Sequence, residues 1–297
     1  MPRGIFVFYK FRNNFAKAIA SKDSIPLSNF SDLPEKQTEP DAEVVVHMLW
    51  VYGELSNLER LSCSSFVQNG YRVRLWTYAD MRDVPFGVDL CDAREILPES
   101  RIFRYYNGSY AGFADLFRYA VLCMKGGLWA DLDVICMLPA LKLQAKAVDG
   151  FVVTEHKLDG RLHRLNNNLI YLPQPKSGDI IDLALAIAER YEMQKLRWGD
   201  CGPRLLTMLA RNYPVVVPTL MEPDFANPLS PAACPRALFK KGTRLPKSAG
   251  FLHCYNERWR KKGFDKNSPW PATTLLGRLA NRYLPELSAT TRERING

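Results

Sequence analysis

Two aspartates separated by a single residue are the strongest candidates for chemistry in this chain. Asp131 and Asp133 flank Leu132 in a segment, 128–137, whose composition predicts a strand that Pro139 soon ends. Alternate side chains of a strand share one face, so both carboxylates would lie together. Two buried like charges need a cation or strong donors, and hard carboxylate oxygens suit Mg²⁺ or Mn²⁺. Because ligands of open α/β sheets gather at the carboxyl ends of strands, the pair predicts a divalent cation with a bound phosphate.

A second charged pair lies on the preceding helix. An apolar stripe at helical spacing predicts a helix that begins at Ala111, and Gly126-Gly127 supplies the left-handed conformation that ends it. Asp115 and Arg118 project away from the stripe. They would form a surface ion pair worth only a few tenths of a kcal/mol. However, Ala111 and Leu122 share their face, so we expect it to be covered, and a polar ligand needing an acceptor and a guanidinium would fit.

Nearly continuous apolar runs indicate the elements that must position these residues. Residues 44–50 are rich in β-branched side chains and predict a strand buried on both faces, residues 54–69 predict a helix, and residues 73–78 predict a second strand. Strand, helix and strand in succession indicate a parallel α/β sheet. Taken alone, Trp50 in such a run is more often a core residue, and Asn166–Asn168 more often a turn. The Pro-rich stretch 214–246 predicts surface loops.

Composition bounds the remaining possibilities. The 297 residues carry a formal charge of +9 and are 47% hydrophobic, which excludes collagen-like, coiled-coil and wholly disordered chains. The basic residues form no long run, so we do not expect nucleic acid as a partner. Seven cysteines without a CxxC pair predict reduced thiols. No spanning segment or signal peptide is evident, so we expect a cytoplasmic protein.

The first 42 residues differ from the rest. Residues 1–22 mix five aromatic side chains with five lysines or arginines, which predicts either contact with an anionic membrane surface or packing on the domain, and residues 23–42 predict a linker.

Several motifs together resemble glycosyltransferase family 32, which is related to the glucosylating domain of the large clostridial toxins. The central block is the family's DXD segment, and the outer motifs follow in the family's order over about residues 43–262. The segments that carry the resemblance are Val46–Trp50, Ala114–Tyr119, Gly126–Asp133, Asn166–Ile170, Gly202–Thr207 and His253–Trp259.

The resemblance implies a GT-A fold: an α/β domain in which a Rossmann-like nucleotide-sugar-binding half is fused to an acceptor-binding half, with helical additions. We expect an extension and linker over residues 1–42, the transferase domain over 43–265, and a tail packed on it over 266–297. The family also implies a retaining transfer of a hexose or N-acetylhexosamine from a nucleotide sugar, most simply a UDP-sugar.

The resemblance also implies roles for individual residues. Asp133 would hold Mn²⁺ or Mg²⁺ directly, while Asp131 would bind ribose or sugar hydroxyls and contact the metal through water. Asp115 and Arg118 would hold sugar hydroxyls, and Trp50 would stack on the base. The remaining expected donor-site residues are His47, Trp129, Trp259 and either Asn166 or Asn167, and His253 is either a metal ligand or a packed histidine.

The chain departs from the family at two positions. Trp129 stands where the family usually has tyrosine, and Arg258 stands where a serine commonly precedes the closing tryptophan. The larger indole would reshape the sugar pocket, and the third metal ligand is left open.

The sequence leaves several functions possible, which differ in the acceptor or in the reaction. We expect a glycan or lipid-linked glycan in surface polysaccharide synthesis, on the inner face of a membrane. The alternatives are a toxin-like transferase with a protein acceptor, a metal-dependent nucleotidyltransferase, and an inactive basic protein that binds glycans or lipids. A nucleotidyltransferase would need a phosphate loop near the first strand, which the sequence lacks, and the intact Asp115, Arg118, Asp131 and Asp133 set argues against an inactive protein.

Overall fold

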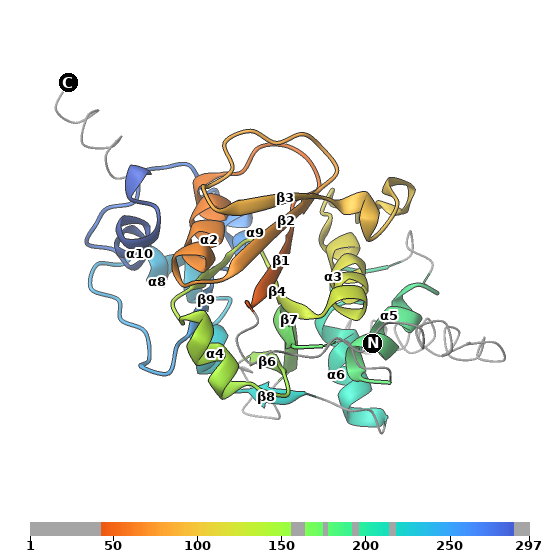
Figure 1. The fold of residues 1–297 in the computed structure, drawn as a ribbon. Helices are drawn as coiled ribbons and strands as arrows, with labels where there is room; N and C mark the ends of the chain where they lie inside the picture. Colours follow the sequence, from red (N-terminus) through yellow and green to blue (C-terminus); the bar gives the residue numbers. More distant parts are fainter. Residues whose placement is uncertain (1–42, 156–163, 175–177, 192–195, 214–217, 288–297) are drawn as a thin grey trace, which may run out of the picture.

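A seven-stranded sheet with the order β3-β2-β1-β4-β7-β6-β8 forms the centre of the protein (Figure 1). The computed structural model describes residues 43–155, 164–174, 178–191, 196–213 and 218–287. The strands of the sheet are β1 (Val45–Leu49), β2 (Arg72–Thr77), β3 (Val88–Asp92), β4 (Gly127–Ala130), β6 (Phe151–Glu155), β7 (Arg164–Leu172) and β8 (Thr219–Met221).

The sheet is parallel in one half and mixed in the other. Strand β1 pairs in parallel with β2 and β4, and β2 pairs in parallel with β3. Strand β7 is antiparallel to both β4 and β6, while β8 is parallel to β6. The predicted α/β class is confirmed. The two strands and the helix expected over residues 44–78 are β1, α2 (Asn57–Gln68) and β2, with ends that differ by a few residues.

Helices cover both faces of this sheet (Figure 1). One face packs against α3 (Ala111–Lys125), α5 (Ile180–Ala188) and α6 (Pro203–Asn212). The other packs against α2, α4 (Ala140–Lys146) and α7 (Pro223–Ala226). The central strand β1 is therefore buried on both sides, which is why it is almost uninterruptedly apolar.

A third core lies on the far side of α2. It joins a two-stranded sheet of β5 (Val134–Cys136) and β9 (Phe251–His253) to helices α8 (Cys234–Phe239), α9 (Asn256–Lys262) and α10 (Leu275–Tyr283). Lys266 forms an ion pair with Glu59 of α2. All seven cysteines are free thiols. Among the described residues, no helix is both long and apolar enough to cross a membrane.

The continuous strand predicted over residues 128–137 is wrong. Strand β4 ends at Ala130, and a turn closed by the Val134 N–H donating to the Asp131 carbonyl (2.9 Å) leads into β5 of the second sheet. The helix stop lies at the expected place, but Gly126 has φ 63° and ψ −154°, which is outside the left-handed helical region. Gly127, with φ 90°, lies so close to β1 that a Cβ would be 2.8 Å from the Val45 carbonyl oxygen.

Candidate active site

Asp131, Asp133 and His253 form a cluster at the carboxyl end of β4. Their ligand atoms all lie within 4.8 Å of one another. The antiparallel register of β5 and β9 places His253 opposite Val134, directly beside Asp133, and His253 Nε2 lies 3.4 Å from Asp133 Oδ1. The two carboxylates converge as predicted, but through a turn between two sheets rather than through the alternation of one strand.

Backbone groups fix the position of Asp133. The Asn256 N–H donates to Asp133 Oδ2 (2.7 Å), and the Cys254 N–H donates to the Asp133 carbonyl (2.8 Å). Between them, Tyr255 adopts a left-handed conformation with φ 51° and ψ 55°, which is uncommon for a non-glycine residue. These bonds occupy Oδ2 and leave Oδ1 facing His253.

Asn227 orients His253 by facing its Nδ1 atom, and no pattern in the sequence indicated this residue beyond its place in the Pro-rich stretch. Its side chain is buried, with the residue 1% exposed. The Asn227 Nδ2 donates to the Thr154 carbonyl (2.9 Å), so its Oδ1 must face His253 Nδ1 at 3.2 Å. The proton of a neutral His253 is thereby assigned to Nδ1, and the lone pair of Nε2 is directed at the carboxylates.

Arg118 links helix α3 to the cluster. Its guanidinium lies 3.2 Å from Asp115 Oδ1 and 3.1 Å from Asp131 Oδ1, and it also donates to the Asn167 carbonyl. The residue is 3% exposed. The prediction that this helix face is covered is confirmed, and the alternative of a solvated surface pair is wrong.

Trp129 closes the other side of Arg118. The guanidinium carbon lies 4.9 Å from the centre of the indole ring, and the Trp129 Nε1–H donates to Asp131 Oδ1 (2.8 Å). Arg118 and Trp129 together hold one oxygen of Asp131. The Asp131 side chain is still 28% exposed, so it can be reached from solvent.

Asp115 lies deeper than Asp131. It accepts a hydrogen bond from Asn167 Nδ2 (2.8 Å), and a Cβ on Gly202, just before α6, would come within 2.7 Å of its Oδ2. Burial raises the pKa of Asp115 to about 6, against the opposing attraction of Arg118. The predicted hold of Asp115 and Arg118 on sugar hydroxyls stays a prediction.

Each charged group of the cluster shifts the pKa of its neighbours. Burial raises the pKa of Asp131, and the neighbouring Asp133 carboxylate raises it further. Burial acts in the same sense on Asp133, but the nearby His253 outweighs it and lowers the Asp133 pKa. The same contact raises the pKa of His253 despite its burial. A divalent cation beside these two carboxylates would favour the charged form of both.

Strand alternation separates the three asparagines. Residues 166–168 lie within β7. The turn that their composition predicts is therefore wrong, and the strand implied by the family resemblance is observed. Asn167 contacts Asp115, whereas the Asn166 Nδ2 donates to Glu155 Oε1 (3.2 Å). Of the two candidates, Asn167 is therefore the one that reaches the Arg118 network.

The predicted donor-site residues differ in exposure. Trp50 is half-buried at the end of β1, and its Nε1–H donates to the Gly53 carbonyl (3.0 Å). His47 accepts from Trp76 Nε1 (3.1 Å) inside the α3-side core, and Trp259, 0% exposed, donates to the Cys254 carbonyl (2.8 Å).

His47 and Trp259 are both enclosed by neighbouring side chains in this structure, and their role at the donor site stays a prediction. Trp50 stays a predicted base platform. Arg258 is exposed and does not belong to the cluster of candidate metal ligands. Among the described residues, His253 is the third member of that cluster, beside Asp131 and Asp133.

Comparison with known proteins agrees with the site. Residues 62–148, which include α3 and both aspartates, match the family described as a glycosyltransferase sugar-binding region containing DXD motif. The resemblance to DXD-containing glycosyltransferases expected from the sequence is confirmed over these residues, which lie within an α/β fold.

Among solved structures, the chain is similar to one described as PaToxG Glycosyltransferase, with 16% identity and a TM-score of 0.38. The alignment covers 57% of this chain and 70% of that chain. The comparison with curated proteins found no match.

Proposed function

We propose that this chain is a retaining, metal-dependent glycosyltransferase that moves a hexose or N-acetylhexosamine from a UDP-sugar. The observation that carries the proposal is the Asp131, Asp133 and His253 cluster, which stands at the end of β4 within and beside the matched DXD region. The carboxyl end of a central strand is where α/β proteins bind nucleotide ligands.

The residues of the cluster fit a divalent cation. Two carboxylates and one imidazole suit Mn²⁺, and carboxylates with water suit Mg²⁺. Asp133 Oδ1 and His253 Nε2 would hold the ion, because Oδ2 is bonded to the Asn256 N–H and Nδ1 faces Asn227. When bound, the cation would offset the charge that develops on the departing nucleoside diphosphate.

The other residues would position these ligands. Arg118 and Trp129 fix the Oδ1 of Asp131, so the remaining oxygen would be free for a ribose or sugar hydroxyl or for a metal-bound water. Asp115 and Asn167 fix Arg118 in turn. This preorganisation avoids reorienting charges during the reaction. Retention of the anomeric configuration rests on the family resemblance alone.

We also propose that the acceptor is a glycan or lipid-linked glycan at an anionic membrane surface. The support is the mixture of aromatic and cationic side chains in residues 1–22, which lie outside the described residues, and the charge of +9.

Donor hydrolysis tests the enzymatic proposal. The full chain is incubated with a panel of UDP- and GDP-sugars and Mn²⁺, free nucleotide is measured, and the anomeric configuration of the released or transferred sugar is read by NMR. We expect nucleotide release from a UDP-sugar that EDTA abolishes. Release from no donor would contradict the transferase proposal.

A pair of matched variants tests the metal role. Asp133→Asn removes one ligand charge with little change of volume. It should raise the activation free energy by several kcal/mol, which lowers turnover about a thousandfold. Asp149→Asn, an exposed residue just before β6, is the same change elsewhere and should leave turnover unaltered. Activity that survives both EDTA and Asp133→Asn would refute the metal role.

A further inference from the structure

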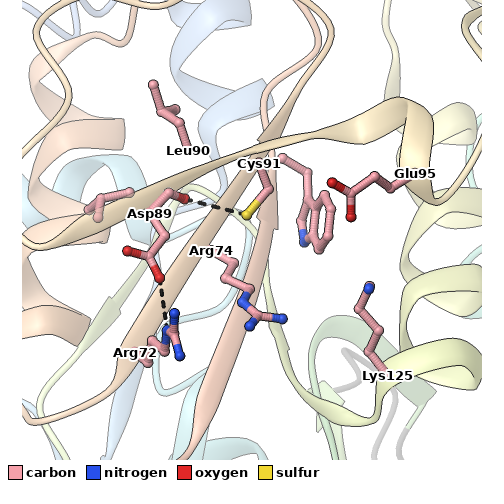
Figure 2. Close-up of a pocket in the computed structure, with 9 residues that line it drawn as sticks. Arg72, Arg74, Asp89, Leu90, Cys91, Glu95 and Lys125 are labelled. Atoms are coloured by element: carbon pink, nitrogen blue, oxygen red, sulfur yellow. Dashed lines mark hydrogen bonds and ion pairs between the residues drawn. The ribbon is translucent and has the colours of Figure 1, made fainter.

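A pocket of about 630 Å³ lies on the outer part of the sheet, between β2, β3 and the end of α3 (Figure 2). Arg72 and Arg74 project into it from β2, and Lys125 reaches it from the last residue of α3. Asp89 and Glu95 supply the acidic side chains of its lining.

The positive charges of this pocket are only partly neutralised. Arg72 forms an exposed ion pair with Asp89 (2.8 Å). Arg74, which is half-buried, and Lys125 have no carboxylate partner within 4 Å among the described residues. Their field extends beneath the pocket to the neutral His47, whose pKa falls to about 3 through burial first and through these two charges as well.

The pocket is separate from the candidate active site. Arg72 begins β2, whereas the DXD aspartates follow the carboxyl end of β4, and β2 and β4 are both parallel to β1. Lys125 ends α3, and Asp115 lies ten residues earlier on that helix, a rise of about 15 Å. The basic side chains of the pocket therefore lie towards the opposite ends of the strands.

We propose that this pocket binds a phosphate group, presented by a free phosphorylated small molecule or by the headgroup of an anionic lipid. Arg74 would offer its planar fork and Lys125 a point charge, the two donor types that recognise phosphate oxygens. The volume suits a small ligand. Glu95, which also lines the pocket (Figure 2), limits the net positive charge and so opposes anion binding.

The soluble arm of the test uses inorganic phosphate and the full chain in EDTA, which keeps the candidate metal cluster out of the measurement. NMR follows the indole N–H of Trp76, which lines the pocket and bonds to His47. Arg74→Gln and Lys125→Gln should each weaken phosphate binding at least about tenfold, and Glu95→Gln should tighten it. Their spectra also show whether each variant is folded.

Matched controls use charges elsewhere on the surface. Arg236→Gln in α8 and Lys142→Gln in α4 remove the same charges from exposed positions and should leave binding unchanged. Asp133→Asn should also bind phosphate as the unaltered chain does. The phosphate-site proposal is therefore tested independently of the transferase proposal.

The lipid arm uses co-sedimentation with phosphatidylcholine vesicles, with and without phosphatidic acid. If the Arg74 and Lys125 variants lose binding to the anionic vesicles alone, the source is a lipid headgroup, and if they lose only inorganic phosphate, it is a free phosphate ester. Both outcomes support the site. The proposal is overturned if these two variants match the unaltered chain with both probes, or if Glu95→Gln weakens binding.

Discussion

Replacing Arg118 by lysine tests the central network, because the lysine keeps the charge but loses the planar fork. In the structure the guanidinium reaches Asp115 at 3.2 Å, Asp131 at 3.1 Å and the Asn167 carbonyl at once. An ammonium group cannot span all three. A buried acceptor left unsatisfied costs about 1–3 kcal/mol, and breaking a buried ion pair costs about 3–5 kcal/mol. We expect Arg118→Lys to lower the free energy of unfolding by about 2–4 kcal/mol.

Arg94 offers a matched control for this substitution. It also bridges two carboxylates, Asp92 at 3.2 Å and Glu99 at 2.6 Å, but its side chain is 47% exposed. Exposed pairs contribute about 0–1 kcal/mol, so Arg94→Lys should change stability by no more than that.

Urea unfolding followed by circular dichroism at pH 7 in EDTA measures both variants, and the slope against urea should be unchanged. Arg118→Lys should also lose donor hydrolysis, because Asp131 would no longer be held. The reasoning is refuted if the two variants lose the same stability to within about 0.5 kcal/mol, since surface pairs would explain that result.

Three further measurements follow from the same geometry. Burial raises the folded pKa of Asp115 to about 6, above its unfolded value, so the stability contributed by its protonation is present below about pH 4 and is lost as the pH rises to about 6. This loss amounts to up to about 3 kcal/mol, and Asp115→Asn should reduce it in urea unfolding experiments across that pH range. An unchanged dependence of stability on pH in the variant would contradict this prediction. Asn227→Ala should weaken Mn²⁺ binding about 10–100-fold in calorimetry by releasing His253, while the exposed Asn107→Ala should not; equal affinities would show that His253 needs no support. Removing residues 1–40 should reduce co-sedimentation with anionic but not neutral vesicles, and equal partitioning of both chains would exclude that segment as the anchor.

Local pattern was enough to predict the elements around the site. The apolar run ending near Trp50 predicted a buried strand because a strand covered on both faces has no solvent side to keep polar. The stripe on α3 predicted a helix with Asp115 and Arg118 on its second face, and Ala111 and Leu122 indicated that this face is covered.

The spacing of Asp131 and Asp133 correctly predicted that their carboxylates lie close together, but the reason, alternation along one strand, was wrong. A continuous strand was expected, but β4 ends at Ala130, which is its last residue paired with β7 and lies opposite Leu169. The chain then turns and joins β9 instead, and nothing within residues 128–137 specifies that choice.

The sequence by itself determined the α/β pattern, the helix stop at Gly126-Gly127 and the paired carboxylates, because each depends on residues close together in the chain. Only the tertiary structure decided which groups surround those carboxylates. His253 arrives through the pairing of β5 with β9, Asn227 through its bond to the Thr154 carbonyl, and the burial of Arg118 through the strand that covers it. These contacts join segments far apart in the chain, and their free energy comes from burial and hydrogen bonds that exist only once the sheets and helices have packed.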